Sequence, residues 1–389
     1  MKTLPKKQKA LVLDIKKHPW KTSTGYEQVQ VQVPLLDEKK NPQDAFSALI
    51  EVKYAGICGT DRGIWKRQVF KDLIHNSLKA ERKTQRIAGH EFTGKVLDIG
   101  SDVEHVHGIK KGDTVSGDSH ITCGKCFFCN MGQEEICQDQ AIMGIGIDGV
   151  FAQYIKIPAK NLWPVEYSRI RPEVAAMMDP FGNAIHACSK VNLQGKTVAV
   201  LGSGPIGMFT ILLANAFGAS YVLAADVNEK NLAMAKKLGA HETVLLESKD
   251  SFTADEKLVN FAKKKTQGRG VDIAFEMAGP NSSVNSALAI TRSGGDVILF
   301  GLKDGDFTIP KFKDVIVKGL NVYGVIGRQI FQTWHTSEQM LANQENGIQE
   351  KIWDIILQGG KETMIPFESF SKQLVEKQME LHPKLIFKM

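Results

Sequence analysis

Residues 196–226, KTVAVLGSGPIGMFTILLANAFGASYVLAAD, carry the pattern that decides the fold. The apolar run TVAVL is typical of a buried strand, MFTILLANAFGA has the length and composition of a helix, and YVLAAD indicates a second strand. Further along, VDIAFEMAG and GGDVILFGL repeat the buried-strand pattern. Strands that alternate with helices predict an α/β domain, a parallel sheet wound with helices on both faces.

A glycine motif, G-x-G-x-x-G, joins the first of these strands to its helix. Such glycines permit a tight turn, a close approach of the backbone to a pyrophosphate and a close helix–strand contact. Asp226 ends the next strand, where a carboxylate accepts hydrogen bonds from the adenine ribose and repels a 2′-phosphate. The alternative for Asp226 is a helix cap. We therefore expect NAD to be bound here by Gly202, Gly204, Pro205, Gly207 and Asp226.

The residues that precede this domain have a different pattern of apolar and polar residues. ALVLDI, VQVQV, ALIEVKYAGICG and FTGKVLDIG alternate apolar and polar residues, which predicts half-buried strands in a β-rich domain. A polar, basic stretch over residues 65–86 interrupts them, and its composition fits either a short helix or a surface loop. With 389 residues the chain exceeds what one core usually organises, so two domains are expected.

Bulk composition excludes several classes of protein. A hydrophobic content of 43% and a charged content of 24% are those of an ordinary globular chain. The net charge of +6 is spread in lysine pairs rather than gathered in a block, so no nucleic-acid partner is expected. No apolar run is long enough to span a membrane and no secretory leader is visible, so we expect a soluble, cytoplasmic protein with no membrane partner.

Four of the six cysteines lie close together in CGKCFFCNMGQEEIC. Their spacing is C-x2-C-x2-C-x7-C, formed by Cys123, Cys126, Cys129 and Cys137. Four thiolates at such spacing can surround one tetrahedral Zn²⁺ with no open position, which indicates a structural zinc site. Free or disulfide-bonded thiols and an iron–sulfur cluster are the alternatives.

The order of motifs along the chain resembles that of the medium-chain zinc alcohol dehydrogenases: CGTD, then GHE, then the four-cysteine segment, then GSGPIG. Within that superfamily, SGDSHITCGKC, DPFGNAIHA, DVNE and GVIGRQIFQTW are similar to segments of the threonine dehydrogenases. The resemblance spans nearly the whole chain. It implies a GroES-like β-rich catalytic domain with the zinc lobe over residues 1–172, a Rossmann domain over 173–324, and a C-terminal segment, 325–389, that returns to the catalytic domain. It also implies a homo-oligomer, a tetramer.

The resemblance further implies a second, catalytic zinc ion held by Cys58, His90 and Glu91. Asp179 would be a nearby carboxylate that either ligates this zinc or serves the proton relay, and Thr60 would be the relay hydroxyl. A strand-end cap is the alternative role for Thr60. His120 would lie beside the substrate pocket. The residues expected to pack around the NAD are Ile206, Leu302, Val325 and Ile326.

The activity that this resemblance implies is NAD-dependent oxidation of a small-molecule secondary alcohol, L-threonine to 2-amino-3-oxobutanoate. A polyol dehydrogenase of the sorbitol type, a butanediol-type dehydrogenase and a catalytically silent NAD(H)-binding relative are the alternatives. Two departures from the family pattern are the reason why these alternative activities are retained. Gly63 stands where the threonine dehydrogenases have a histidine, and the segment between Cys58 and His90 is longer. That segment contains His75, which is either a surface residue or a replacement that a loop brings to the site.

Overall fold

A computed structural model describes residues 4–247, 252–303 and 305–389. The chain forms two compact units. The first comprises residues 1–180 and 330–389, and the second comprises residues 181–329. The division therefore falls a few residues after each boundary expected from the sequence, and the first cut lies inside helix α6 (Met178–Ser189).

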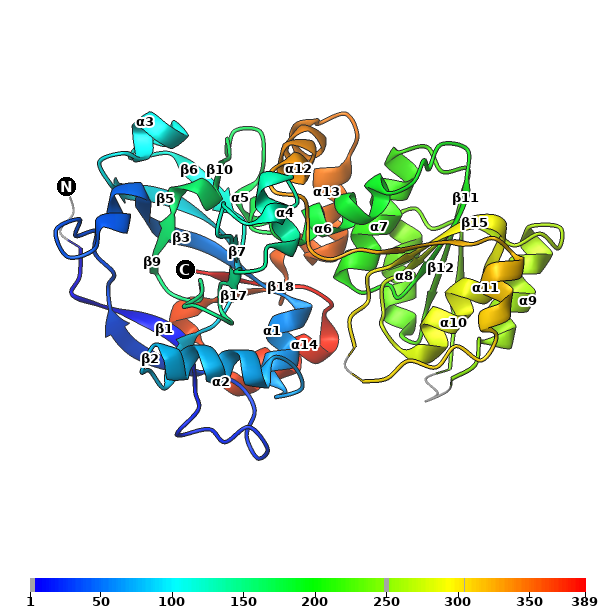
Figure 1. Ribbon diagram of the computed structural model, residues 1–389, viewed down its shortest axis with the longest axis horizontal. Helices are drawn as coiled ribbons and strands as arrows, with labels where there is room; N and C mark the ends of the chain where they lie inside the picture. Colours follow the sequence, from blue (N-terminus) through cyan, green and yellow to red (C-terminus); the bar gives the residue numbers. More distant parts are fainter. Residues whose placement is uncertain (1–3, 248–251, 304) are drawn as a thin grey trace. The chain divides into compact units, whose positions relative to one another are not determined.

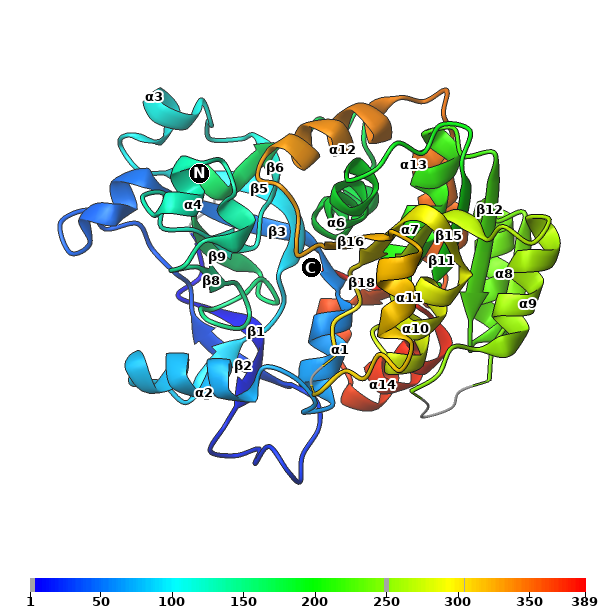
Figure 2. The same ribbon diagram turned by 45° about the vertical axis from the view of Figure 1, so that its right-hand side comes forward.

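The second unit is built on a parallel six-stranded sheet in the order β13-β12-β11-β14-β15-β16. Its strands are β11 (Thr197–Leu201), β12 (Tyr221–Asp226), β13 (Glu242–Leu245), β14 (Val271–Glu276), β15 (Thr291–Leu299) and β16 (Asn321–Gly324). Its helices are α7 (Pro205–Ala216), α8 (Glu229–Leu238), α9 (Glu256–Lys265), α10 (Asn281–Ile290) and α11 (Phe312–Val317). Helices flank this sheet on both faces (Figures 1 and 2), which confirms the predicted doubly wound fold.

Burial explains the continuous apolar runs in the sequence of this unit. Four of the five residues of β11 are buried, and α7 buries every position from 207 to 214. A parallel sheet covered on both faces removes both sides of each strand from water, so its strands become continuous apolar runs. The strand order reverses between β11 and β14, and ligands of such sheets bind beside the carboxyl ends of the strands at that point.

The first unit is β-rich. Its main sheet has the order β10-β6-β5-β3-β18-β17, with β9 also paired to β3, and a smaller sheet has the order β2-β1-β4. The strands are β1 (Lys7–Asp14), β2 (Glu27–Gln32), β3 (Ser47–Ile57), β4 (Gln85–Ile87), β5 (Glu91–Ile99), β6 (Thr114–Gly117), β9 (Tyr154–Pro158), β10 (Leu162–Pro164), β17 (Met364–Pro366) and β18 (Leu385–Lys388). Strand β18 joins this sheet from the far end of the chain by pairing antiparallel with β3.

The remaining elements are short. They are β7 (His120–Ile121), β8 (Ala141–Ile142), α1 (Gly59–Trp65), α2 (Lys71–Ala80), α3 (Val103–His107), α4 (Phe127–Asn130), α5 (Pro172–Ala175), α12 (Gln332–Ala342), α13 (Ile348–Lys351) and α14 (Lys372–Leu381). In the ranges that the structure describes, no helix is both long enough and apolar enough to cross a membrane.

The stretch over residues 65–86, for which the sequence left two readings, contains the helix α2. Ile74 and Leu78 are buried on one side of it. The segment ends at Arg86, which is itself buried and forms ion pairs with Glu81 and with Asp148, the latter at 3.2 Å. These ion pairs offset the cost of burying the guanidinium, so Arg86 fixes the end of the segment to the β-rich unit.

Candidate active site

The four cysteines of the zinc lobe converge, with their sulfur atoms all within 4.8 Å of one another. The Sγ of Cys126 lies 3.5 Å from that of Cys129 and 3.9 Å from that of Cys137. These distances are too long for disulfide bonds, and all four cysteines are free. Ligands of one tetrahedral zinc, at about 2.3 Å from the metal, lie roughly 3.8 Å apart, so the spacing fits a single ion rather than a larger iron–sulfur cluster.

Backbone groups of the lobe reinforce this arrangement. The N–H of Cys126 points to the Sγ of Cys123 at 3.3 Å, and the N–H of Cys123 points to the Sγ of Cys137 at 3.3 Å. Donors aimed at sulfur favour the thiolate form, which is the form that binds metal. The lobe therefore fits the structural zinc that its spacing predicts.

A second group of potential ligands is formed by Cys58, His90 and Glu91, whose donor atoms also lie within 4.8 Å of one another. Strand pairing brings them together. Cys58 follows the last residue of β3 and is the N-cap of α1, while Glu91 begins β5. Because β3 and β5 are antiparallel in a register that sets Gly56 opposite Glu91, both ligand segments meet at one end of the strand pair.

The carboxylate of Glu91 is completely buried and its two oxygens differ. Oε2 is in direct contact with the ammonium group of Lys384, which is also buried and donates to the carbonyl of Ile57 at 3.2 Å. Oε1 is buried and, among the described residues, lacks a hydrogen-bond partner. Buried polar atoms are almost always satisfied, so a cation between Cys58 and Glu91 would complete the site.

Gly56 makes room for this carboxylate. A Cβ at position 56 would lie 2.0 Å from Oε2 of Glu91, so any side chain there would displace the carboxylate. Lys384 and Gly56 were both missed by the sequence analysis. Neither belongs to a motif that signals metal binding, and only the pairing of β18 and β5 with β3 shows their role.

Asp61 supports the two other ligands. Its Oδ2 accepts a hydrogen bond of 2.9 Å from the N–H of Cys58, and its Oδ1 lies 3.5 Å from Nδ1 of His90. Burial opposes protonation of His90, but the negative charges of Asp61 and Cys58 outweigh it and raise the pKa of His90 well above its ordinary value. The charges that hold this proton also attract a metal cation, which takes the place of the proton when it binds.

Asp179 is buried in the first turn of α6. Its carboxylate is not within 4.8 Å of all three donor atoms of Cys58, His90 and Glu91, so the structure does not join it to their group. A direct ligand role for Asp179 therefore has no support from this geometry.

Thr60 lies half-buried in the first turn of α1, two residues after Cys58. On the next turn, a Cβ added to Gly63 would lie 2.7 Å from Cγ2 of Val69. Val69 thus occupies the space in which a histidine side chain would begin. His75 packs edge-on against Trp20, with ring centroids 5.9 Å apart, and it belongs to neither group of potential ligands.

His120 is buried and is oriented by a neighbouring carboxylate. Its Nδ1 lies 3.1 Å from Oδ1 of Asp118, and the indole Nε1 of Trp334 donates to Oδ2 of the same carboxylate at 2.8 Å. Asp118 and Trp334 are fully buried. This arrangement fixes the ring of His120 and favours the tautomer with its proton on Nδ1. Asp118 and Trp334 were not predicted as parts of the site.

The glycine motif of the second unit has the geometry that its three positions require. Gly202 adopts a left-handed φ of +93°, which favours glycine. A Cβ on Gly207 would lie 1.9 Å from the carbonyl oxygen of Gly202, so the close contact of helix and strand excludes a side chain. A Cβ on Gly204, the N-cap of α7, would meet nothing within 4 Å. The open space in front of this helix end fits a pyrophosphate group.

Asp226 holds the loop beside this motif. Its Oδ2 accepts from the N–H of Ser203 at 2.5 Å, and its Oδ1 accepts from the N–H of Asn228 at 2.7 Å. The side chain that caps α8 is Asn228, which accepts from the N–H groups of Lys230 and Asn231. The alternative role for Asp226, a cap of that helix, is therefore wrong.

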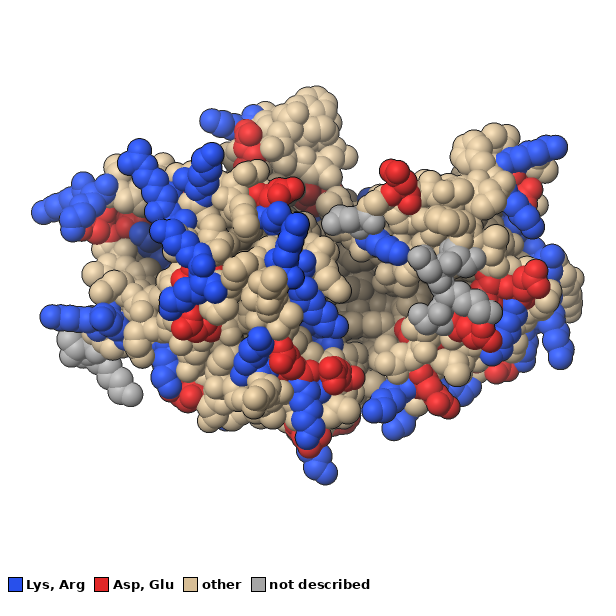
Figure 3. All heavy atoms as spheres, turned by 90° about the horizontal axis from the view of Figure 1, so that it is seen from below, with Lys and Arg blue, Asp and Glu red and all other residues tan. Residues whose placement is uncertain are grey.

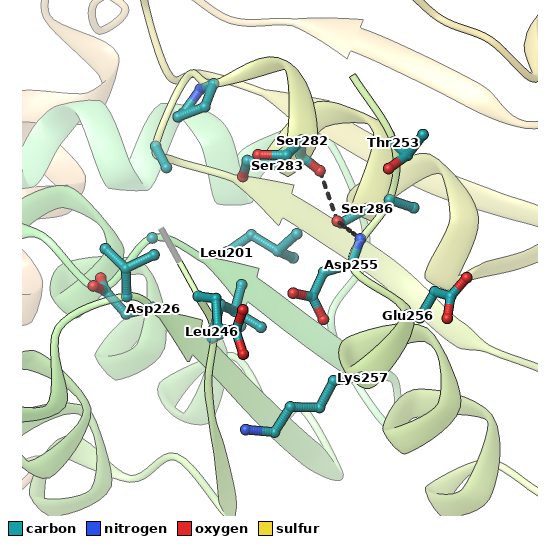
Figure 4. A pocket seen from close by; sticks show the side chains of 17 residues that line it. Leu201, Asp226, Leu246, Thr253, Asp255, Glu256, Lys257, Ser282, Ser283 and Ser286 are labelled. Atoms are coloured by element: carbon teal, nitrogen blue, oxygen red, sulfur yellow. Dashed lines mark hydrogen bonds between the residues drawn. The ribbon is translucent and has the colours of Figure 1, made fainter. Parts of the chain in front are cut away.

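A cavity of about 460 Å³ opens next to Asp226 at the carboxyl ends of β11 and β12. Figure 4 shows Asp226 on one side and Asp255 on the other, with Ser283 and Ser286 between the strands and α10. The carboxylates that line it are Asp226, Glu247, Asp255 and Glu256. Among the residues that the structure describes, the single lining cation is Lys257, which donates to the carbonyl of Leu245 at 2.7 Å. This excess of negative charge disfavours a 2′-phosphate and fits NAD.

The other residues expected around NAD lie in the second unit but outside this cavity. Pro205 and Ile206 are half-buried at the start of α7, and Val325 is buried. Leu302 and Ile326 are 76% and 54% exposed, which is unusual for large apolar side chains and leaves them available to an apolar surface of a ligand.

Comparison with known proteins places both units among dehydrogenases. Residues 44–167 match the family model described as "Alcohol dehydrogenase GroES-like domain", and residues 205–343 match the model described as "Zinc-binding dehydrogenase". An L-threonine 3-dehydrogenase of Bacillus subtilis is 36% identical over 317 residues, covering 79% of this chain and 84% of that protein. One from Pyrococcus horikoshii is 36% identical over 323 residues, covering 82% and 86%.

A solved structure with the same fold is described as a short-chain alcohol dehydrogenase from E. coli CFT073 complexed with the cofactor NADH. Its TM-score is 0.76 at 20% sequence identity, and the match covers 99% of this chain and 100% of that one. At this identity the likeness concerns the fold alone.

The two cysteine-containing groups predict two zinc ions per chain. We expect Cys129→Ser to remove the lobe zinc and Cys58→Ser to remove the other, because each substitution deletes one thiolate ligand. Zinc content after dialysis against a weak chelator should fall from two ions to about one in each variant. Cys188→Ser, which changes a buried thiol outside both groups, is the control and should keep both ions. Two zinc ions retained by either ligand variant would reject that site.

The geometry of Asp226 predicts cofactor preference. Asp226→Ala removes a carboxylate that can accept from the ribose, and a charge-assisted hydrogen bond is worth about 1.5–3 kcal/mol. We expect the affinity for NAD relative to NADP to fall about tenfold or more, measured by fluorescence titration with NADH and NADPH. Asp306→Ala, at an exposed site outside the cavity, should leave the ratio unchanged. An unaltered ratio in the Asp226 variant would show that this carboxylate serves only the loop.

Proposed function

This chain belongs to the zinc-binding alcohol dehydrogenase family, and on that premise we propose that it oxidises the 3-hydroxyl of L-threonine to give 2-amino-3-oxobutanoate. Zinc- and NAD-dependent oxidation of an alcohol, the reaction class predicted from the sequence, is confirmed by this membership. Threonine as the substrate is supported by relatives that are 36% identical and are named L-threonine 3-dehydrogenases.

The observation that carries the proposal is the group of Cys58, His90 and Glu91, in which one buried oxygen of Glu91 has no hydrogen-bond partner among the described residues. Three protein ligands leave the fourth position of a zinc ion open to a substrate oxygen, unlike the four thiolates of the lobe. Zinc at this site would act as a Lewis acid on the alcohol, and bound NAD would accept the hydride from the same carbon.

The chain's own residues would manage the proton that the alcohol loses. In our proposal the hydroxyl of Thr60, two residues after Cys58, accepts the proton of the substrate hydroxyl and passes its own proton toward solvent. Gly63 cannot titrate, and Val69 fills the space beside it, so the later step of the relay must use water or another residue. His120, held by Asp118, is proposed to orient the substrate.

The departures at Gly63 and in the longer segment between Cys58 and His90 favour a second candidate, a polyol or butanediol-type dehydrogenase, because both lie in the unit that would shape the substrate pocket. A silent NAD(H)-binding relative is less well supported. Such a protein would need the nucleotide unit but would have no use for three potential metal ligands that converge in the other unit.

A substrate panel tests the proposal. Zinc-replete protein with NAD is offered L-threonine, sorbitol, 2,3-butanediol and 2-propanol, and NADH formation is measured. We expect kcat/KM for L-threonine to exceed that for every other alcohol by about tenfold or more, since a site that hydrogen-bonds polar substituents rejects analogues that lack them. Cys58→Ser should abolish turnover while NADH binding persists, and Cys188→Ser should be active. A polyol preferred over threonine would refute the substrate, and no activity with any alcohol would favour the silent relative.

We further propose that the enzyme is a homotetramer in the cytoplasm. Light scattering coupled to size-exclusion chromatography should give four times the protomer mass of 43.0 kDa. A mass equal to one or two protomers at micromolar concentration would contradict the tetramer.

A further inference from the structure

A second cavity, of about 910 Å³, lies in the β-rich unit. Its walls come from the loop between β1 and β2, which projects at the lower edge of Figure 1, from the residues that follow α1, and from the start of α14. Part of it is therefore built by the segment over residues 65–86, which the sequence analysis could not relate to the family pattern. No step of the proposed reaction uses it.

The charges that line this cavity are all positive. They are contributed by Lys21, Lys66, Arg67 and Lys372, and none of the described residues that line it is a carboxylate. Within the described ranges, no ion pair connects Lys21, Lys66 or Arg67 to an acidic residue. Figure 3 shows the corresponding face of the molecule, with many basic side chains over the first unit. A concave surface of one sign concentrates the field and attracts ions of the opposite sign.

The carboxylate of Glu376, which contacts the cavity residues Thr24 and Lys372, does not cancel this charge. It accepts from the indole Nε1 of Trp65 at 3.1 Å and from the hydroxyl of Thr24 at 3.2 Å, and it lies 3.9 Å from the ammonium group of Lys372. One carboxylate shared among these donors leaves the cavity with an excess of positive charge.

Arg67 is the buried member of the cationic set, with 7% of its surface exposed. Its guanidinium donates to the carbonyls of Gly25 at 2.7 Å and Ile64 at 2.8 Å, and its Nε has no partner among the described residues. Carbonyl groups satisfy donors but carry no net charge, so the buried cation lacks a counter-ion. Its φ of +60° adds a cost of about 1 kcal/mol that glycine would avoid.

Aromatic and hydroxyl groups complete the walls. The guanidinium of Arg67 lies 5.7 Å from the ring centroid of Trp20. Thr22 and Ser23 line the same cavity, and the hydroxyl of Ser23 donates to the carbonyl of Pro19 at 2.8 Å. Tyr26, also in the wall, donates to the carbonyl of Asp61 at 3.0 Å. Cations, hydroxyl donors and an indole are the groups that bind phosphate and a heterocyclic ring.

We propose that this cavity binds a small molecule that carries two or more phosphate groups. Several ammonium groups around one concavity suit a polyanion better than a single charge. The volume is within the range of about 300–1,000 Å³ that is usual for small-molecule sites. The ligand would supply the counter-ion that Arg67 lacks. This site is separate from the nucleotide cavity beside Asp226, which is lined by carboxylates.

Calorimetric titration with pyrophosphate tests the proposal. The full chain is used with its zinc and with saturating NADH, so that phosphate positions in the second unit are filled, and zinc content is checked after titration because pyrophosphate binds metal. The test variant carries Lys21→Gln, Lys66→Gln and Lys372→Gln. The control carries Lys39→Gln, Lys264→Gln and Lys361→Gln, three exposed lysines outside the cavity.

We expect saturable binding of one pyrophosphate per chain by the wild type and the control. The test variant should bind at least about tenfold more weakly, because each exposed ion pair contributes about 0.2–1 kcal/mol and three are removed. Two zinc ions retained per chain show that the first unit of this variant is folded, since both zinc sites lie in that unit. Equal affinity in the two triple variants, or no saturable binding by the wild type, would overturn the proposal.

Three further ligands test which part of a ligand the cavity recognises. ATP and tripolyphosphate should both bind, and tighter binding of ATP would assign the indole of Trp20 to a nucleotide base, whereas equal binding would assign the site to the phosphates alone. Either result supports a phosphate site. Adenosine, which has no phosphate, should not bind with comparable affinity, and if it does, charge is not what the cavity recognises.

Discussion

The register of strand β3 with its two neighbours is the constraint on which the proposed chemistry depends. Antiparallel pairing sets Gly56 opposite Glu91 on β5 and Ile57 opposite Leu385 on β18. Since Cys58 follows this strand directly, one end of the sheet collects residues from three distant parts of the chain. A shift of one residue in either pairing would turn the side chains of that strand to the opposite face and separate the ligands.

The buried charges of this site depend on one another, because each buried acid needs a cation beside it. Asp61 and Glu91 are buried acids, and Lys384 and Arg62 are the cations beside them. Burial lowers the pKa of Arg62 to about 10, so its guanidinium still carries its charge near neutral pH. Once a metal has displaced the proton of His90, the negative groups, including the thiolate of Cys58, would outnumber the positive ones by one. A divalent cation would turn this into an excess of one positive charge, which a negatively charged substrate oxygen would neutralise.

The two cavities have opposite charge for reasons of local structure. In the second unit, acidic residues follow β12 and begin α9, where they cap helices or receive backbone donors. In the first unit, lysines from a loop, from the end of α1 and from α14 surround a buried arginine. The guanidinium of Arg67 donates to backbone carbonyls at the C-terminal end of α1 rather than to a carboxylate. The same helix carries Cys58 at its other end.

The sequence by itself determined the doubly wound sheet, the glycine motif and the zinc lobe. Each of these depends on residues that are neighbours in the chain: buried runs beside a tight turn, or four cysteines within one short segment. The ligand set of Cys58, His90 and Glu91 could be proposed only by family resemblance, because nothing local links a residue at the end of β3 to one at the start of β5. Lys384, Asp118 and Trp334 gave no signal at all. Lys384 is 293 residues from Glu91 and Trp334 is 216 residues from Asp118, so only the tertiary structure brings each pair together. The cavity around Arg67 was likewise decided by the tertiary structure, since its cations come from three separate segments.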